Sequence, residues 1–364
     1  MMRQVLVYVG TYTRRGSEGI YTCTLDMSTG ALRPLAATGG LSDPSFLALD
    51  PRRRRLYAVS EVDQFEGQPG GGVGAYAIAP DTGALTPLNR VGSGGTWPCH
   101  ISVEATGRHA LVANYRDGRV AMLPILSDGR LGPASHAVQH EGSSVHPQRQ
   151  AGPHAHSITP DPGNRYALAA DLGLDQVLVY RMDLAAGQLR AADPPHIAIK
   201  AGSGPRHLDF HPSRRFVYLI NEIGSTMAAL AYDETRGTLH EQQTLSTLPA
   251  GYEGVSHCAD VHVAPSGRFL YGSNRGHDSI VIYALDAAGR MTLVGLEPTR
   301  GKNPRNFAID PTGTFLLAAN QDSDNIVTFR IDPDTGKLSY TGHEASISMP
   351  VCLKVVPMAS GSGR

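Results

Sequence analysis

The strongest constraint on this chain is a turn segment that recurs about every 50 residues. In each copy a polar stretch runs into a glycine, and a leucine or methionine stands two positions later. The glycines are Gly30, Gly83, Gly129, Gly187, Gly237, Gly289 and Gly336, at spacings of 46 to 58 residues. Glycine adopts a positive φ at no steric cost, as a tight hairpin turn requires. Seven copies therefore predict seven structural units of one kind.

A second set of similar segments lies between these turns. Each copy has a short strand-like stretch, a turn with proline and glycine or arginine, and a run of β-forming residues that ends at a polar residue. The copies are Asp43–Glu61, Trp97–Tyr115, His154–Gly173, Gly204–Glu222, His257–Gly276 and Asn303–Gln321. A seventh copy begins at Met349–Pro357 and stops, and its missing second strand stands at the other end of the chain, in Val5–Thr13.

Four short strands in each unit predict an all-β protein, a seven-bladed β-propeller with four antiparallel strands per blade. We expect the N- and C-terminal strands to share one blade, formed by about residues 3–38 plus 350–357, because this closes the ring and leaves no exposed sheet edge. We interpret residues 1–364 as a single domain. The 41 glycines and 25 prolines are many turn-forming residues for a helical fold, and no stretch shows sustained helical periodicity, so both observations favour the all-β fold.

Composition excludes several classes of protein. Lys and Arg number 32 against 33 Asp and Glu, so nothing attracts the chain to nucleic acid or to an anionic membrane, and we predict neither as a partner. The four cysteines lie far apart and form no CxxC pair, which excludes a zinc ribbon and a disulfide framework. The apolar run Val5–Val9 is too short for a signal peptide or a membrane span. We therefore expect a cytoplasmic protein.

Polar residues gather where the hairpins of the second set begin and end. Both ends of such a hairpin lie at one mouth of the central channel, which we call the top, and the glycine turns lie at the other. The first strands begin with Cys99, His100, His154, His156, Arg206, His207, Asp260, Arg305 and Asn306. The second strands end with Glu61, Asn114, Asp171, Asn221, Glu222, Asn274, Arg275 and Asn320. Such a rim suits an anion-binding site with acid–base chemistry, although any single residue could simply cap a strand.

Several motifs make the chain similar to the seven-bladed propeller lactonase family over essentially its whole length. They are YVGTYT (Tyr8–Thr13), GPRHLDFHP (Gly204–Pro212), NE (Asn221–Glu222), ADVHVAPSGRFLYGSNRG (Ala259–Gly276) and NPRNFAIDPTG (Asn303–Gly313). The family includes the propeller type of bacterial 6-phosphogluconolactonase and, more distantly, the fungal carboxy-cis,cis-muconate cyclase. The resemblance implies a cytoplasmic lactone hydrolase of the pentose phosphate pathway, which opens 6-phospho-D-glucono-1,5-lactone to 6-phosphogluconate without a metal or other cofactor.

The resemblance also implies catalytic residues. A histidine, two arginines and a glutamate on the channel rim are the proposed active residues of the muconate-type relatives. By motif these are His156, Arg206, Glu222 and Arg275 in this sequence, with His154 as a second choice for the histidine.

The residues themselves are compatible with lactone hydrolysis, which needs an activated water, a partner for the carbonyl oxygen and a proton donor for the leaving hydroxyl. Glu222 or His156 could act as general base, and Arg206 could stabilise the oxyanion beside His207. Arg275, with Arg305 or Lys302, could hold a phosphate. The remaining predicted substrate contacts are His154, Asn114, Asp171, Asn274 and Asn320.

Three alternatives remain open. A lactonising cycloisomerase would use the same cationic rim on a dicarboxylate. A propeller without enzymatic activity would bind a partner on its top face, although a single tryptophan makes an aromatic docking surface less favoured. A calcium-dependent lactonase would use Asn114, Asp171, Asn274 and Glu222 as oxygen ligands, but we predict no metal site because no ligand set of recognised spacing occurs.

Overall fold

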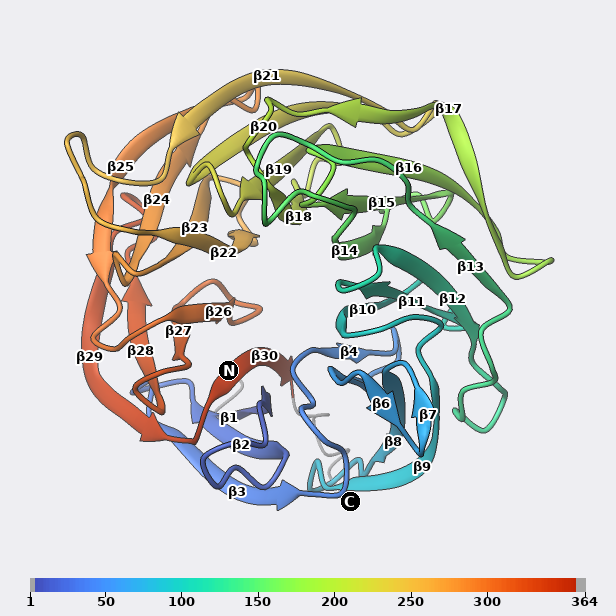
Figure 1. Ribbon diagram of the computed structural model, residues 1–364. Helices are drawn as coiled ribbons and strands as arrows, with labels where there is room; N and C mark the ends of the chain where they lie inside the picture. The colour runs from blue at the N-terminus through green and yellow to red at the C-terminus, as the bar shows by residue number, and fades with distance from the viewer. Residues whose placement is uncertain (1–3, 358–364) are drawn as a thin grey trace.

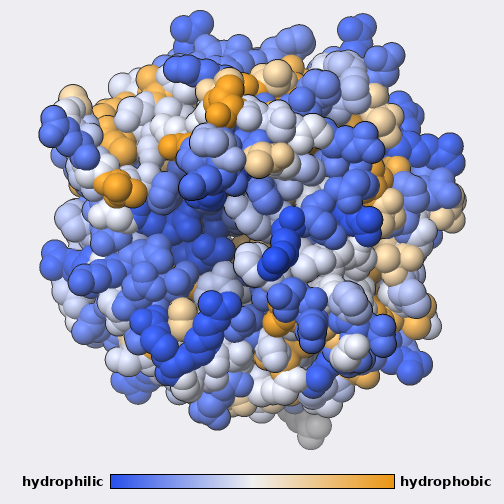
Figure 2. All heavy atoms as spheres, viewed as in Figure 1, coloured by the Kyte–Doolittle hydropathy of each residue, from blue (hydrophilic) through white to orange (hydrophobic). Residues whose placement is uncertain are grey.

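The computed structural model describes residues 4–357, and all regular structure in this range is β-strand. Seven four-stranded antiparallel sheets are arranged around a central axis as the blades of a propeller (Figure 1). The predicted all-β, seven-bladed fold is therefore confirmed. The face seen in Figure 2 is dominated by hydrophilic side chains and is hollowed near its centre. Within the described range no helix is long and apolar enough to cross a bilayer.

The strands of each blade follow in order from the channel outward. The first blade contains β30 (Pro350–Pro357), β1 (Gln4–Thr11), β2 (Ile20–Asp26) and β3 (Leu32–Thr38). The second contains β4 (Leu47–Leu49), β5 (Arg55–Ser60), β8 (Gly72–Ile78) and β9 (Leu85–Gly92), and the small hairpin of β6 (Gln64–Phe65) and β7 (Gln68–Pro69) stands apart from its sheet. The third contains β10 (Pro98–Val103), β11 (His109–Asn114), β12 (Arg119–Pro124) and β13 (His136–Gln139).

The other four blades repeat this order. The fourth contains β14 (Ala155–Pro160), β15 (Tyr166–Asp171), β16 (Gln176–Asp183) and β17 (Gln188–Ala198). The fifth contains β18 (Pro205–Phe210), β19 (Phe216–Asn221), β20 (Thr226–Asp233) and β21 (Thr238–Ser246). The sixth contains β22 (His257–Val263), β23 (Phe269–Arg275), β24 (Ser279–Leu285) and β25 (Met291–Pro298). The seventh contains β26 (Pro304–Ile309), β27 (Phe315–Asn320), β28 (Asn325–Ile331) and β29 (Leu338–Ser346).

The first blade closes the ring as predicted. β30 supplies its innermost strand and pairs antiparallel with β1, with Val5 opposite Pro357 and Val9 opposite Leu353. The chain ends are thus tied together by main-chain hydrogen bonds, and the ring has no open sheet edge at this point.

The recurring glycine turns hold neighbouring blades together. All seven glycines have a positive φ, between 65° and 91°. In four places a buried tyrosine from one blade donates its hydroxyl to the carbonyl oxygen of the turn glycine in the next. These bonds are Tyr8 to Gly83 (2.8 Å), Tyr57 to Gly129 (3.2 Å), Tyr218 to Gly289 (3.0 Å) and Tyr271 to Gly336 (2.9 Å). The repeated turn therefore shapes a hairpin and also fixes the next blade.

Apolar side chains fill the space between the blades rather than the channel. Val5 and Val7 of β1, for example, share one buried cluster with Phe315 and Leu317 of β27. All four cysteines are buried and unpaired, as expected. Because the core lies between the sheets, the innermost strands are free to carry polar side chains into the channel.

Candidate active site

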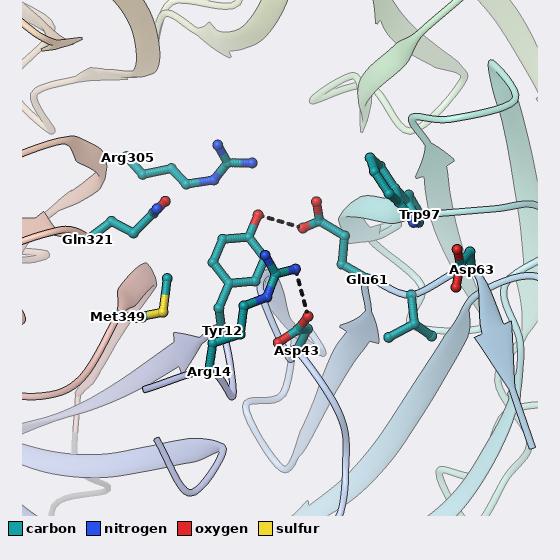
Figure 3. A pocket seen from close by; sticks show the side chains of 10 residues that line it. Tyr12, Arg14, Asp43, Glu61, Asp63, Trp97, Arg305, Gln321 and Met349 are labelled. Atoms are coloured by element: carbon teal, nitrogen blue, oxygen red, sulfur yellow. Dashed lines mark hydrogen bonds and ion pairs between the residues drawn. The ribbon is translucent and has the colours of Figure 1, made fainter. Parts of the chain in front are cut away.

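Two adjoining compartments form a cavity at the top of the channel, and they share Glu61, Trp97 and Arg305. We call the first, of about 300 Å³, the arginine compartment. It is lined by Glu61, Trp97, Cys99, Tyr115, Arg149, His156, Glu222, His257, Arg275 and Arg305. The second, of about 510 Å³, is the Tyr12 compartment (Figure 3). It is lined by Tyr12, Arg14, Asp43, Glu61, Val62, Asp63, Trp97, Arg305, Gln321 and Met349.

The ends of the second strands supply much of this lining through a regular pattern. Each strand has, at its end or next to it, a buried polar residue that is hydrogen-bonded to a neighbouring segment, and in six of the seven blades the residue after it reaches the cavity. The buried residues are Thr11, Ser60, Asn114, Asp171, Asn221, Asn274 and Asn320. The residues that follow them and line the cavity are Tyr12, Glu61, Tyr115, Glu222, Arg275 and Gln321, whereas Leu172 is buried.

β-Bulges in the innermost strands supply part of the remaining lining, namely Cys99, His156 and Arg305. The register shifts between Pro98 and His100 in β10, and the strands β14, β18 and β26 have the same irregularity. A bulge places an extra residue in the strand and re-aims its side chain, which is why bulges are frequent next to active sites. The inserted residues are Cys99, His156, Arg206 and Arg305.

Glu222 is the centre of the arginine compartment. Its Oε2 accepts from Arg206 Nε at 2.9 Å and lies 2.8 Å from Arg275 Nη2, and its Oε1 accepts from Arg149 Nη2 at 2.5 Å. The Glu222 side chain is only 6% exposed, and that of Arg206 only 2%. Burial by itself raises the pKa of Glu222, but Arg275 and Arg206 outweigh it and hold the pKa well below its usual range. Glu222 is therefore a permanent anion.

Glu61 has the opposite environment. Its Oε2 accepts hydrogen bonds from Tyr12 (3.0 Å) and Ser45 (2.5 Å). Burial raises its pKa, and the opposing effects of Arg305 and the two hydroxyls do not cancel this rise. Glu61 and Glu222 thus have pKa values displaced in opposite directions within one cavity, an arrangement typical of acid–base sites.

Arg305 extends into the space between the two compartments, across from Glu61 (Figure 3). Its guanidinium lies 5.6 Å from the centre of the Tyr12 ring, and in residues 4–357 it has no hydrogen-bond or ion-pair partner. Burial by itself lowers the pKa of Arg305, but Tyr12 and Glu61 raise it by more than that. The net pKa is therefore raised, and the guanidinium stays charged. A guanidinium with unused donors beside a cavity is suited to bind an anionic oxygen.

The two predicted histidines lie next to each other at the edge of the arginine compartment. His156 Nε2 is 3.8 Å from Glu222 Oε2, and burial together with Arg206 lowers its pKa well below the usual value, so its imidazole is neutral. His154 stacks on the Tyr115 ring at 4.6 Å, and its Nδ1 lies 2.9 Å from the Tyr115 carbonyl oxygen. His156 lines the cavity, whereas His154 holds Tyr115 in place.

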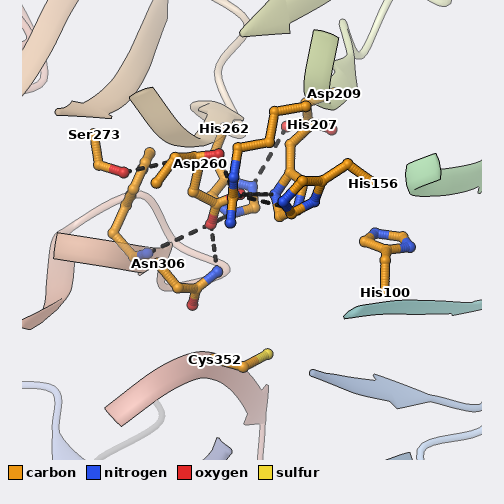
Figure 4. Close-up of polar contacts among 12 residues, drawn as sticks. His100, His156, His207, Asp209, Asp260, His262, Ser273, Asn306 and Cys352 are labelled. Carbon is orange, nitrogen blue, oxygen red and sulfur yellow. Dashed lines mark hydrogen bonds and ion pairs between the residues drawn. The ribbon is translucent and has the colours of Figure 1, made fainter. Parts of the chain in front are cut away.

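His207 lies lower in the channel than predicted. It lines a separate lower chamber of about 270 Å³, together with Phe46, His100, Asp260, His262 and Lys354 among others. Its Nδ1 is 2.8 Å from Asp260 Oδ1, and His262 Nε2 is 3.0 Å from the other oxygen of the same carboxylate (Figure 4). His207 thus faces this chamber, although its ring also lies against the Arg206 guanidinium, with Nε2 3.3 Å from Arg206 Nη1.

Four predicted substrate contacts are inside the blades. Asn114, Asp171, Asn274 and Asn320 have no exposed surface, and each is used in hydrogen bonds to its surroundings. They are the buried members of the strand-end pattern, and the residue that follows lines the cavity in three of the four cases, Tyr115, Arg275 and Gln321. Lys302 is exposed, in a groove that adjoins the arginine compartment through His257 and Arg275.

The oxygen ligands of the calcium alternative do not meet. Asn114, Asp171 and Asn274 belong to three different blades, and all three are buried. The carboxylate of Glu222 is surrounded by guanidiniums, which repel a cation. Among the residues that the structure describes, no three His, Cys, Asp or Glu side chains are placed to hold a metal ion.

The sequence reasoning assigned no catalytic or substrate-binding role to several residues that line the cavity: Tyr12, Glu61, Trp97, Tyr115, Arg149 and His257. Glu61 and Tyr115 follow the strand-end pattern, and Tyr12 stands in the YVGTYT motif, so the position after the buried polar residue was a usable signal. Arg149 comes from the long loop between β13 and β14, where no repeat predicts its place.

Comparison with known proteins agrees with this geometry. Residues 6–355 match the family model described as "Lactonase, 7-bladed beta-propeller". The chain is 38% identical over 355 residues to the 6-phosphogluconolactonase of Bacillus subtilis, which covers 97% of this chain and 99% of the relative. It is 35% identical over 350 residues to the 6-phosphogluconolactonase of Formosa agariphila, with 94% and 97% covered. The solved structure of the periplasmic gluconolactonase PpgL of Pseudomonas aeruginosa superposes with a TM-score of 0.93 at 36% identity, covering 98% of this chain and all of the other.

Proposed function

This chain belongs to the seven-bladed β-propeller lactonase family, and we propose that it hydrolyses the ring ester of a sugar-acid lactone. The favoured substrate is 6-phospho-D-glucono-1,5-lactone, and the product is 6-phosphogluconate. The relatives named 6-phosphogluconolactonase support the phosphorylated substrate, whereas the neighbour named gluconolactonase supports lactone opening in general.

The observation that carries this proposal is the excess of positive charge in the arginine compartment. Four guanidiniums, those of Arg149, Arg206, Arg275 and Arg305, lie on or next to its lining, which contains only two carboxylates, Glu61 and Glu222. A concave site with fixed positive charge raises the local concentration of an anionic substrate. A phosphorylated lactone has that charge, and its ester carbonyl gains negative charge as water attacks.

We assign the oxyanion to Arg305 rather than to Arg206. Arg206 is buried, outside the lining of the cavity, and donates from Nε to Glu222 and from Nη1 to the carbonyl oxygen of Ala259. Arg305 has all its donors available at the cavity. Donors that are already in place where charge develops contribute about 10²–10³-fold to kcat.

Glu222, Arg206 and Arg275 form the fixed electrostatic frame of the site in this proposal. A carboxylate whose pKa is held so low is a poor proton acceptor, so Glu222 positions the arginines instead of activating water. His156 is neutral and lines the same compartment, where its ring can accept a hydrogen bond from a sugar hydroxyl.

We assign the phosphate end of the substrate to the groove that contains Lys302, on the side formed by His257 and Arg275 rather than by Asp278 and Asp322. This groove shares His257 and Arg275 with the arginine compartment. The Lys302 ammonium is exposed and has no ion-pair partner within residues 4–357, so it is free to bind a phosphate oxygen.

The decisive experiment compares fresh 6-phosphogluconolactone with glucono-1,5-lactone, after subtraction of spontaneous hydrolysis. We expect catalysis with both, and a higher kcat/KM with the phosphorylated lactone. Lys302→Met should lower kcat/KM about tenfold for the phosphorylated substrate only, since one hydrogen bond to a charged group contributes on that scale. The exposed Lys337, on the glycine turn of the seventh blade, provides the control Lys337→Met. Absence of catalysis with both lactones would contradict the proposed function, and equal kcat/KM values would contradict phosphate recognition.

We also propose that the protein works in the reducing cytoplasm, since four buried, unpaired cysteines are usual there. The neighbour PpgL is described as periplasmic. Fractionation of the native host, followed by immunodetection, tests the location directly.

A further inference from the structure

We propose that Glu61 is the catalytic residue that transfers the proton during lactone opening, with Arg305 facing it across the cavity. This inference rests on the proposed function and assigns the proton to a residue outside the Glu222 cluster. It is carried by the position of Glu61, by the one oxygen of its carboxylate that remains free, and by what surrounds it.

Glu61 is held so that one oxygen is anchored and the other is free. Its backbone N–H donates to the carbonyl oxygen of Asp43 at 3.1 Å, directly after the end of β5. Both hydroxyl donors, Tyr12 and Ser45, reach the same oxygen, Oε2. Oε1 has no hydrogen-bond partner in the part of the chain that the structure describes, and Glu61 borders both compartments. The free oxygen is therefore available to a water molecule or a substrate in the cavity.

Four groups set the protonation of Glu61, and they come from all the elements around it. Burial raises its pKa, Arg305 of β26 lowers it, the hydroxyls of Tyr12 and Ser45 lower it, and Asp43 raises it. Cys99 of β10 also lies near, and burial raises the pKa of its thiol, so it stays neutral. The net rise gives Glu61 a greater proton affinity than an ordinary carboxylate, which suits a group that must take up a proton and then release it.

The chemistry balances with these two residues. The Glu61 carboxylate takes a proton from a water molecule as the water oxygen bonds to C1 of the lactone, and the carbonyl electrons move to the oxygen that Arg305 binds. When this tetrahedral intermediate collapses, the bond between C1 and the ring oxygen breaks. The proton on Glu61 passes to the leaving ring oxygen, which becomes a hydroxyl. The new carboxylic acid loses its proton to solvent, and Glu61 is again a carboxylate.

Glu61→Gln tests this role directly, because the amide oxygen can still accept from Tyr12 and Ser45. We expect kcat to fall by roughly 10²-fold or more, with the melting temperature and the binding of 6-phosphogluconate retained. The matched control is Glu66→Gln, an exposed glutamate in the loop after β5, which should keep full activity. Wild-type activity together with near-full kcat of Glu61→Gln would overturn the inference alone. Inactive wild type would overturn the proposed function, and this inference with it.

A second variant tests the pH dependence of kcat/KM, which would not shift if Glu61 had only a structural role. Tyr12→Phe removes a hydrogen bond that lowers the pKa of Glu61, so that pKa should rise. Because the carboxylate form is required, kcat/KM decreases as pH falls through the Glu61 pKa. The acid limb of the pH profile should therefore move to higher pH in Tyr12→Phe. An unchanged acid limb in Tyr12→Phe would contradict the assignment even if Glu61→Gln fails to fold.

Discussion

The cavity at the top of the channel and the lower chamber both contain buried charges, but they use them differently. In the lower chamber, Asp260 has each oxygen occupied. Its Oδ1 lies at His207, and its Oδ2 lies at His262 and accepts a hydrogen bond from the Asn306 side chain. In the upper cavity, Arg305 has no partner within residues 4–357, and Glu61 keeps a free oxygen. The lower chamber is lined by the inner strands, whereas the ends of the second strands and the loops supply much of the upper cavity.

This contrast separates architecture from function. A buried polar network that is fully satisfied fixes the elements that contribute to it, here the fifth, sixth and seventh blades. Arg305 and Glu61 are only half-buried, and their unused polar atoms border the upper cavity, where they are available to a ligand. We therefore interpret the upper cavity as the reaction site, and the lower chamber as a polar network that stabilises the contacts between blades.

Glu222→Gln should produce the largest effect. Removal of the charge leaves three guanidiniums without their common partner, so kcat/KM should fall by roughly 10²-fold or more as the electrostatic frame is lost. The free energy of unfolding should also fall, by about 3–5 kcal/mol, because breaking a buried ion pair leaves uncompensated charge. Steady-state kinetics and urea denaturation measure the two effects. Glu253→Gln, at an exposed site, is the control, and a variant that loses stability but keeps its kcat/KM would show that Glu222 is only structural.

The fold was predictable because the sequence contains the same turn and strand pattern once in each blade. Seven glycine turns and the split seventh unit were sufficient to expect seven blades and the pairing of β1 with β30. A periodic sequence reports the same local geometry many times, so the conclusion does not depend on any one turn.

The site was predictable only in part. The rim position of Arg206 and Glu222 followed from the hairpin they terminate, but the choice between neighbouring residues depended on details of register. A bulge in β18 separates Arg206 from His207, and a similar distinction separates the buried Asn274 from Arg275 in the cavity. A one-residue change of register moves a side chain to another face. Arg149 lies on an irregular loop, which no period describes.

Asp260→Asn tests the lower chamber, where we expect a loss of stability without a loss of activity. We expect the free energy of unfolding to fall by about 3 kcal/mol, since His262 loses the partner of a largely buried ion pair. The kcat should remain nearly unchanged, because Asp260 lines the lower chamber and not the upper cavity. Urea denaturation and kinetics on the same preparation test both statements. A loss of kcat comparable to that of Glu222→Gln would show that the two regions work as one.

The smallest effect is the pH dependence of stability that the lower chamber confers. Burial lowers the pKa of His262, but Asp260 and Asp209 outweigh it and raise the pKa to about 10, against about 6.5 in the unfolded chain. The stabilisation is thus complete below about pH 6.5 and decreases as pH rises through the folded value. His207, with its pKa lowered to about 4 by burial and Arg206, changes charge only on the acid side. Between about pH 7 and pH 9 the free energy of unfolding should decrease in the wild type and less steeply in Asp260→Asn. Equal slopes in the two proteins, measured by urea denaturation at each pH, would contradict this account of the lower chamber.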